Sequence, residues 1–136
     1  QQRLARFVSS GPHTSRQWLA ATATAQIPDF VGQIVELFDS PRAGDVVLFA
    51  RPGWSFNSSD LAGHGSIYAG EMRVVMAFAG PGIPAGRAID YARNSDVLPS
   101  VVELLGARRR LKHIGRFDGL SLVGRLTATT SPASRP

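Results

Sequence analysis

Residues 94–106 read NSDVLPSVVELLG, and they combine a helix start, an apolar face and a helix stop. Asn, Ser and Asp cap helix N-termini with their side-chain oxygens, and the missing N–H of Pro99 costs little in a first turn. Gly106 suits the position just after the last turn. We expect the following residues to form the buried face of this helix: Val97, Leu98, Val101, Val102, Leu104 and Leu105.

A second helix is predicted over residues 27–38. Pro28 suits its first turn, and Asp29 suits the positive end of its dipole. The apolar residues recur at i, i+3, i+4, i+7 and i+8, the spacing of a helix with one buried stripe: Ile27, Phe30, Val31, Ile34, Val35 and Phe38. A third helix is predicted within the Ala- and Thr-rich residues 14–25.

Two continuous apolar runs separate these helices. Residues 46–50 read VVLFA and residues 74–79 read VVMAFA, without polar alternation, as inner strands covered on both faces do. Residues 88–93 are interpreted as a third short strand. The predicted fold class is therefore α/β, with a small mixed sheet of about three strands and helices packed on it.

Length and composition limit the classes of protein. The 136 residues form one domain at most, and the absence of cysteine excludes disulfides, thiolate nucleophiles and cysteine-based metal sites. No apolar run reaches the roughly 18 residues that a membrane helix needs. So small a sheet has unpaired apolar edges, and the chain begins Gln1-Gln2. We therefore expect a piece of a longer protein, or a homo-oligomer joined through sheet edges.

The net charge is +5, and four positive residues fall in one block: Arg108, Arg109, Arg110 and Lys112. Such a block can bind polyanions by counterion release. A solvated surface or a subunit contact is the alternative interpretation. Nucleic acid is the less favoured partner, because no interleaved aromatic residues accompany the block.

His64 is the candidate metal ligand. It lies between Gly63 and Gly65, in a glycine-rich loop over residues 51–71. Flanking glycines let the backbone approach a metal closely, and imidazole is the commonest protein ligand for metals. A purely structural loop histidine is the alternative. Ser66 lies nearby, but the chain has no Gly-x-Ser-x-Gly elbow to support a catalytic triad.

Five segments resemble, in order, the C-terminal part of the alkaline phosphatase superfamily, particularly type I phosphodiesterases and nucleotide pyrophosphatases. They are GDVVLFARPGW at 44–54, GHGS at 63–66, EMRVVMAFAGPGI at 71–83, the predicted helix at 94–106 and FDGLSL at 117–122. The resemblance covers residues 28–124 and implies that the sheet belongs to a larger alkaline-phosphatase-like fold. The organisation expected is a partly helical N-terminal segment (1–26), the C-terminal portion of such a domain (27–125) and a disordered tail (126–136).

The resemblance implies a two-zinc hydrolase of phosphate esters, with His64 as the last histidine ligand of one metal. The family's nucleophile, aspartate ligands and Asp-His-Gly motif lie upstream, and nothing before Gly44 matches them. A catalytic zinc needs about three protein ligands, so we expect this chain alone to be inactive. The resemblance is compatible with a periplasmic or extracellular location, which the residues leave undetermined. The alternative function is a non-catalytic binding or oligomerisation module that contacts an anionic partner through residues 108–112.

Overall fold

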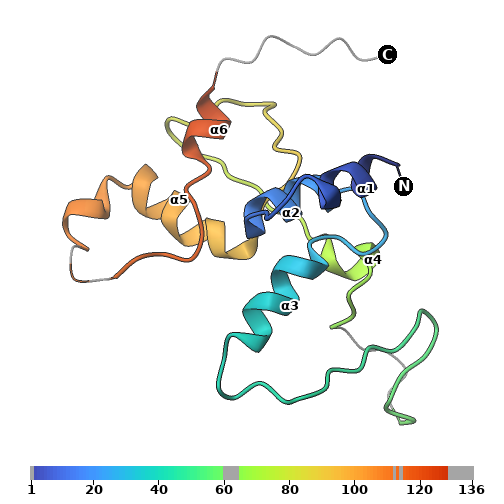
Figure 1. Ribbon diagram of the computed structural model, residues 1–136. Helices are drawn as coiled ribbons and strands as arrows, with labels where there is room; N and C mark the ends of the chain where they lie inside the picture. Colours follow the sequence, from blue (N-terminus) through green and yellow to red (C-terminus); the bar gives the residue numbers. More distant parts are fainter. Residues whose placement is uncertain (1, 60–64, 112, 114, 129–136) are drawn as a thin grey trace. The chain divides into compact units, whose positions relative to one another are not determined.

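The computed structural model describes residues 2–59, 65–111, 113 and 115–128, which contain α-helices and short 3-10 helices and no β-strand. The chain divides into two compact units, Gln1–Val75 and Met76–Pro136. The elements in chain order are α1 (Gln2–Ser9), α2 (Ser15–Thr22), α3 (Phe30–Phe38), α4 (Ala69–Met72), η1 (Asn94–Asp96), α5 (Val97–Leu104), η2 (Ala107–Arg109) and α6 (Val123–Thr127). Figure 1 labels the six α-helices.

The first unit is built on α2, which contacts both α1 and α3. A capping box starts α2: the Gln17 amide N–H donates to Thr14 Oγ1 over 3.2 Å, and the Thr14 N–H donates to Gln17 Oε1 over 2.8 Å. Leu19 and Thr22 are the buried residues of this helix. The Thr22 hydroxyl accepts the Asp29 amide N–H over 2.9 Å, which ties the start of α3 to the end of α2. The helix predicted within residues 14–25 is thereby confirmed.

The predicted helix over residues 27–38 is confirmed as α3, but it starts at Phe30. Asp29 precedes it with φ 54°, in the left-handed region, where Asp is tolerated better than most residues. The expected buried stripe is wrong, since none of its six residues is buried and Val35 is 63% and Phe38 is 45% exposed. The reason is that α2 contacts α3 while no described sheet covers the rest of the stripe.

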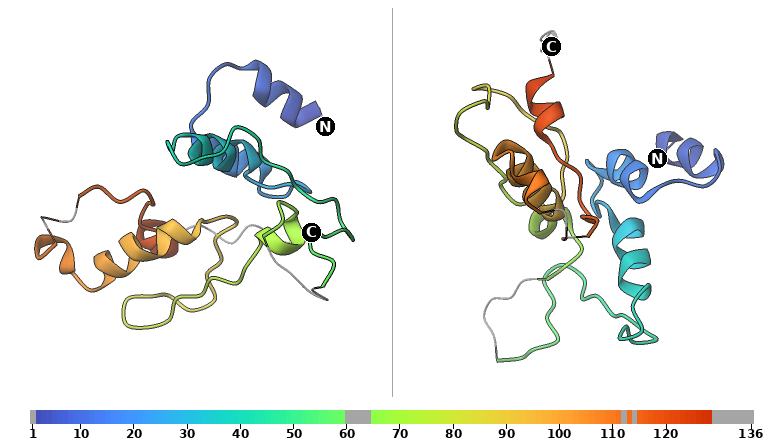
Figure 2. Two further views of the ribbon diagram at one scale, coloured as in Figure 1. Left: turned by 90° about the horizontal axis from the view of Figure 1, so that it is seen from below. Right: turned by 90° about the vertical axis from the view of Figure 1, so that its left-hand side faces the viewer.

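The second unit surrounds α5 with the chain that follows it. Its buried apolar residues include Pro99, Val102, Leu122 and Leu126. In Figure 2 the segment leading to α6 runs back beside α5. The Arg125 guanidinium of α6 lies 4.5 Å from the centre of the Tyr91 ring and donates to the Tyr91 carbonyl over 2.9 Å.

The predicted helix over residues 94–106 is confirmed as η1 followed by α5, but the predicted buried face is wrong in part. Val102 is buried, whereas Leu98 is 56% and Leu105 is 74% exposed. The most deeply buried side chains at this place are polar, Asp96 and Ser100. They face a neighbouring segment that offers backbone N–H groups, so acceptors are needed there rather than apolar groups.

The predicted α/β fold with a three-stranded sheet is wrong, because residues 46–50, 74–79 and 88–93 are irregular and form no β-strand in the described chain. Val46 is 74%, Leu48 is 73% and Val75 is 96% exposed. A continuous apolar run indicates burial, but it becomes a strand only where a second run supplies hydrogen-bond partners. Phe49 instead packs edge-on against Phe30 of α3, at 5.9 Å between ring centres.

Two further expectations depend on these elements. No helix within the described ranges is long and apolar enough to cross a membrane, in agreement with the sequence. We expected a homo-oligomer joined through sheet edges, but the described residues form no sheet that could provide such edges.

Candidate anion-binding site

The basic block follows the end of α5. Gly106 has φ 60°, a left-handed conformation that favours glycine, and its N–H donates to the Glu103 carbonyl over 2.9 Å. The chain then forms η2 (Ala107–Arg109), in which the Arg110 N–H donates to the Ala107 carbonyl over 2.9 Å. The predicted helix stop at Gly106 is therefore confirmed. The turn at Gly106 leads the chain from α5 into the basic residues that follow.

Arg108, Arg109 and Arg110 are all exposed. A 3-10 helix has about three residues per turn, so successive side chains leave its axis about 120° apart. Arg108 and Arg109 lie in η2 and Arg110 follows it, so the three side chains leave the backbone in different directions. Lys112, the fourth predicted residue, lies outside the described residues.

We call residues 107–118 the basic loop. It contains five basic residues and one acidic residue, Asp118. Arg116 is exposed like the three arginines of the block. This excess of positive charge within twelve residues gives the loop a positive field at neutral pH, strongest at low ionic strength.

A buried polar network holds the segment that follows the basic loop against η1 and α5. One oxygen of the fully buried Asp96 carboxylate accepts the Leu120 N–H, and the other accepts the Arg93 N–H, each over 2.9 Å. The Ser100 hydroxyl accepts the Leu122 N–H over 2.9 Å and donates to the Asp96 carbonyl over 2.6 Å. Because these groups are removed from water, each bond is costly to leave unmade.

Gly119 is required where the loop returns to the helix. A Cβ atom at this position would lie 2.0 Å from the Ser95 carbonyl oxygen and 2.6 Å from the Asp96 nitrogen. Both are backbone atoms, which cannot swing away as a flexible side chain can. The basic loop is therefore fixed at its start by the turn at Gly106 and at its end by close contact with η1.

The predicted metal ligand cannot be placed, because His64 lies outside the described residues. Just after it, the Ser66 N–H donates to Glu71 Oε2 over 3.0 Å, and the Tyr68 N–H donates to Ser66 Oγ over 3.2 Å. Ser66 thus serves a local turn before α4. Within the described ranges, no three His, Cys, Asp or Glu side chains gather closely enough to hold a metal ion.

The polar network was not predicted from the sequence, although the sequence contains one signal for it. Asp96, at the start of α5, and Ser100, within it, are four residues apart and so share one helix face. Polar residues at this spacing on a buried face indicate a partner that needs hydrogen bonds. The Asp118-Gly119 pair marks the turn that brings that partner.

The chain was compared with protein-family models, with curated proteins and with solved structures, and none of the three comparisons found a match.

Proposed function

We propose that this chain is a non-catalytic module that binds polyanions through the basic loop. The observation that carries the proposal is the exposure of Arg108, Arg109 and Arg110 on a loop fixed at both ends by α5 and η1. Fixing the ends limits the conformational entropy that the loop loses when it binds. The arginines themselves keep the freedom to adapt to a flexible partner.

The geometry favours an extended polyanion over a small phosphate ion. A small ion is bound best by donors that converge on one point, whereas Arg108 and Arg109 of η2 and the following Arg110 leave the backbone in different directions. A long chain of phosphate or sulfate groups can pass each guanidinium in turn. Charge rather than base identity governs such binding, because Phe117 is the only Phe, Tyr or Trp of the loop and is half-buried.

The test is the salt dependence of binding, with duplex DNA as a polyanion of known charge density. Affinity for a labelled duplex of about 20 base pairs is measured by fluorescence anisotropy at roughly 50–200 mM salt. Replacing Arg108, Arg109 and Arg110 by Gln should reduce the slope of log K against log salt by about 3 and weaken binding at least tenfold. Heparin should displace the duplex, because the loop recognises charge.

A matched control removes the same charge elsewhere. Arg3, Arg6 and Arg42 are exposed, and changing them to Gln lowers the net charge by the same amount. This variant should keep most of the affinity and of the salt slope. If both triple variants lose affinity equally, the net charge binds the polyanion and the basic loop has no special role. If neither loses affinity, the proposal is wrong.

A second proposal comes from the sequence alone. The order of five segments supports a zinc-dependent phosphoesterase in which His64 is a metal ligand and this chain is one part. Zinc content and hydrolysis of a nitrophenyl phosphodiester, with and without His64→Ala in a protein that includes this chain, test it. Equal zinc content and equal rates would exclude that role for His64.

A further inference from the structure

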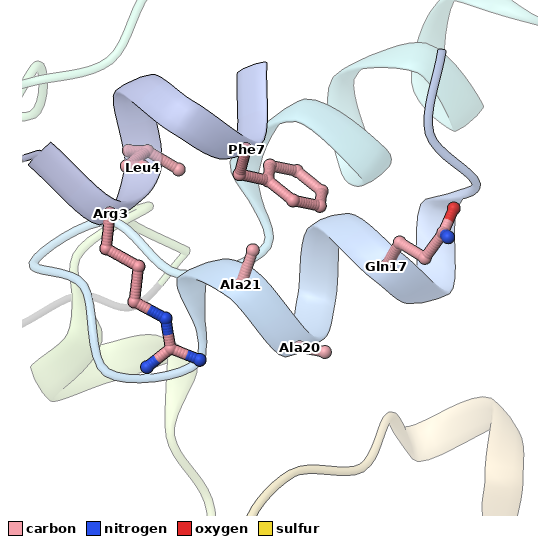
Figure 3. Close-up of a pocket in the computed structure, with 6 residues that line it drawn as sticks. All are labelled: Arg3, Leu4, Phe7, Gln17, Ala20 and Ala21. Atoms are coloured by element: carbon pink, nitrogen blue, oxygen red, sulfur yellow. The ribbon is translucent and has the colours of Figure 1, made fainter. Parts of the chain in front are cut away.

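A groove lies between α1 and α2, in the compact unit that does not contain the basic loop. Its volume is about 240 Å³, and six residues line it: Arg3, Leu4, Phe7, Gln17, Ala20 and Ala21. Figure 3 shows the Arg3 and Gln17 side chains at opposite ends and Phe7 and Ala21 between them. The groove thus combines a hydrocarbon floor with polar ends.

An aromatic cluster holds the two helices that form the groove. The His13 ring stacks on Phe7 at 3.7 Å between centres, and Trp18 meets Phe7 edge-on at 5.1 Å. His13 Nε2 lies 2.6 Å from the Phe7 carbonyl oxygen, so the imidazole bridges the turn between α1 and α2. Because Phe7 belongs to both the cluster and the groove, the apolar wall is positioned before any ligand arrives.

Both polar ends offer hydrogen-bond donors. The exposed Arg3 guanidinium carries only donors and a positive charge. The Gln17 carbonyl oxygen already accepts the Thr14 N–H over 2.8 Å and the Thr14 hydroxyl over 3.1 Å, which leaves the NH₂ group for a ligand. Residues 1–28 contain three arginines and no acidic residue, so the whole neighbourhood favours an anion.

We propose that this groove binds a small amphiphilic carboxylate, with the carboxylate on Arg3 and the hydrocarbon chain against Leu4 and Phe7. A cavity of roughly 150 Å³ holds benzene, so a groove of about 240 Å³ suits a ligand of about ten non-hydrogen atoms. A straight-chain carboxylate of about that size, such as octanoate, fills it. The carboxylate gains a charge-assisted pair, while the chain leaves water.

The chain supplies its own reporter for this binding. Trp18 contacts Phe7, and Trp54 is the other tryptophan. In a Trp54→Phe background the emission comes from Trp18 alone, and octanoate should change it saturably. Octanol and octylammonium have the same chain without the negative charge, and they should bind at least tenfold more weakly.

Two arginines of one helix provide a matched pair of variants. Arg3→Gln should weaken octanoate binding at least tenfold, whereas Arg6→Gln, which removes the same charge from α1 outside the groove lining, should change it less than twofold. Ala21→Leu should abolish the saturable response by filling the groove. Circular dichroism of each variant verifies that the helices remain, and Leu is itself a good helix former.

Three outcomes would overturn the proposal: equal binding of octylammonium and octanoate, equal loss in the Arg3 and Arg6 variants, or unchanged binding in Ala21→Leu. A response to phosphatidylglycerol vesicles without any response to free octanoate would also overturn it, because the ligand would then be a membrane surface. The result is independent of the polyanion test, since the groove and the basic loop belong to different compact units.

Discussion

At the scale of single residues, Gly119 has the least room for a Cβ atom among the described glycines. Gly119→Ala would place a Cβ atom 2.0 Å from the Ser95 carbonyl oxygen, so the backbone must move apart. We expect a loss of about 3 kcal/mol in unfolding free energy, at the upper end for overpacking. Urea denaturation followed by circular dichroism measures it, and the amides of Leu120 and Leu122 should lose protection from hydrogen exchange.

Gly124 is the matched control for that substitution. It lies within α6, and a Cβ atom there meets nothing within 4 Å. Gly124→Ala should leave stability unchanged or raise it by up to about 1 kcal/mol, because Ala has the higher helix propensity. Similar losses in the two variants would show that segment 119–122 does not approach η1 as described.

Asp96 tests the chemistry of the buried network rather than its packing. Its two carboxylate oxygens each accept a backbone N–H, from Arg93 and Leu120. Asp96→Asn keeps the shape but replaces one acceptor by an NH₂ donor that faces another donor. The expected cost is about 1–3 kcal/mol in unfolding free energy. The exposed Asp118, changed to Asn in the same denaturation series, should leave stability unaltered.

At the scale of secondary-structure elements, α2 depends on its N-terminal cap. Thr14→Ala removes the hydroxyl that accepts the Gln17 N–H, and the cost should be about 1 kcal/mol, with loss of helical signal at 222 nm. Thr14→Ser retains an acceptor and should behave nearly as the original chain. If Thr14→Ala matched Thr14→Ser, packing against α1 and α3 rather than the cap would determine where α2 begins.

The helices could be predicted because their signals are local. Residues 27–38 and 94–106 carry apolar residues at helical spacing, residues 14–25 are rich in Ala and Thr, and Gly106 marks the stop of the third segment. A capping bond or a left-handed glycine forms within a few residues of chain and needs no distant partner. Even so, neither α1 nor α4 was predicted as a helix, because each is short and lacks a clear start signal.

The absence of strands from the described residues could not be predicted, because strand formation depends on partners that are distant in the sequence. Residues 46–50 and 74–79 have the composition of buried strands, but composition cannot show whether a second strand is available to pair with them. For the same reason the candidate site was predicted only in part. The arginines of the basic loop are evident from charge, whereas the contacts of Asp96 and Ser100 join residues more than twenty positions apart.

At the scale of the whole molecule, the distribution of apolar surface separates the predicted fold from the observed one. Val75 is 96% exposed, although it lies in the middle of an apolar run that would be interior in a sheet. An exposed substitution away from specific contacts changes stability by about 0.5 kcal/mol or less, whereas a charge forced into an apolar interior is strongly destabilising. One substitution at this position therefore distinguishes the two arrangements.

Val75→Lys is expected to leave the unfolding free energy within about 0.5 kcal/mol of the original chain, as measured by urea denaturation with tryptophan fluorescence. Leu19→Ala, in the same compact unit, removes a side chain that is 5% exposed and should cost about 2–5 kcal/mol. Leu19→Ala calibrates the assay. A measurement that detects the stability lost at a buried leucine would also detect the stability lost when lysine replaces a buried Val75. A loss at Val75→Lys as large as that at Leu19→Ala would mean that residues 74–79 are covered in solution, by another segment or by a second copy of this chain.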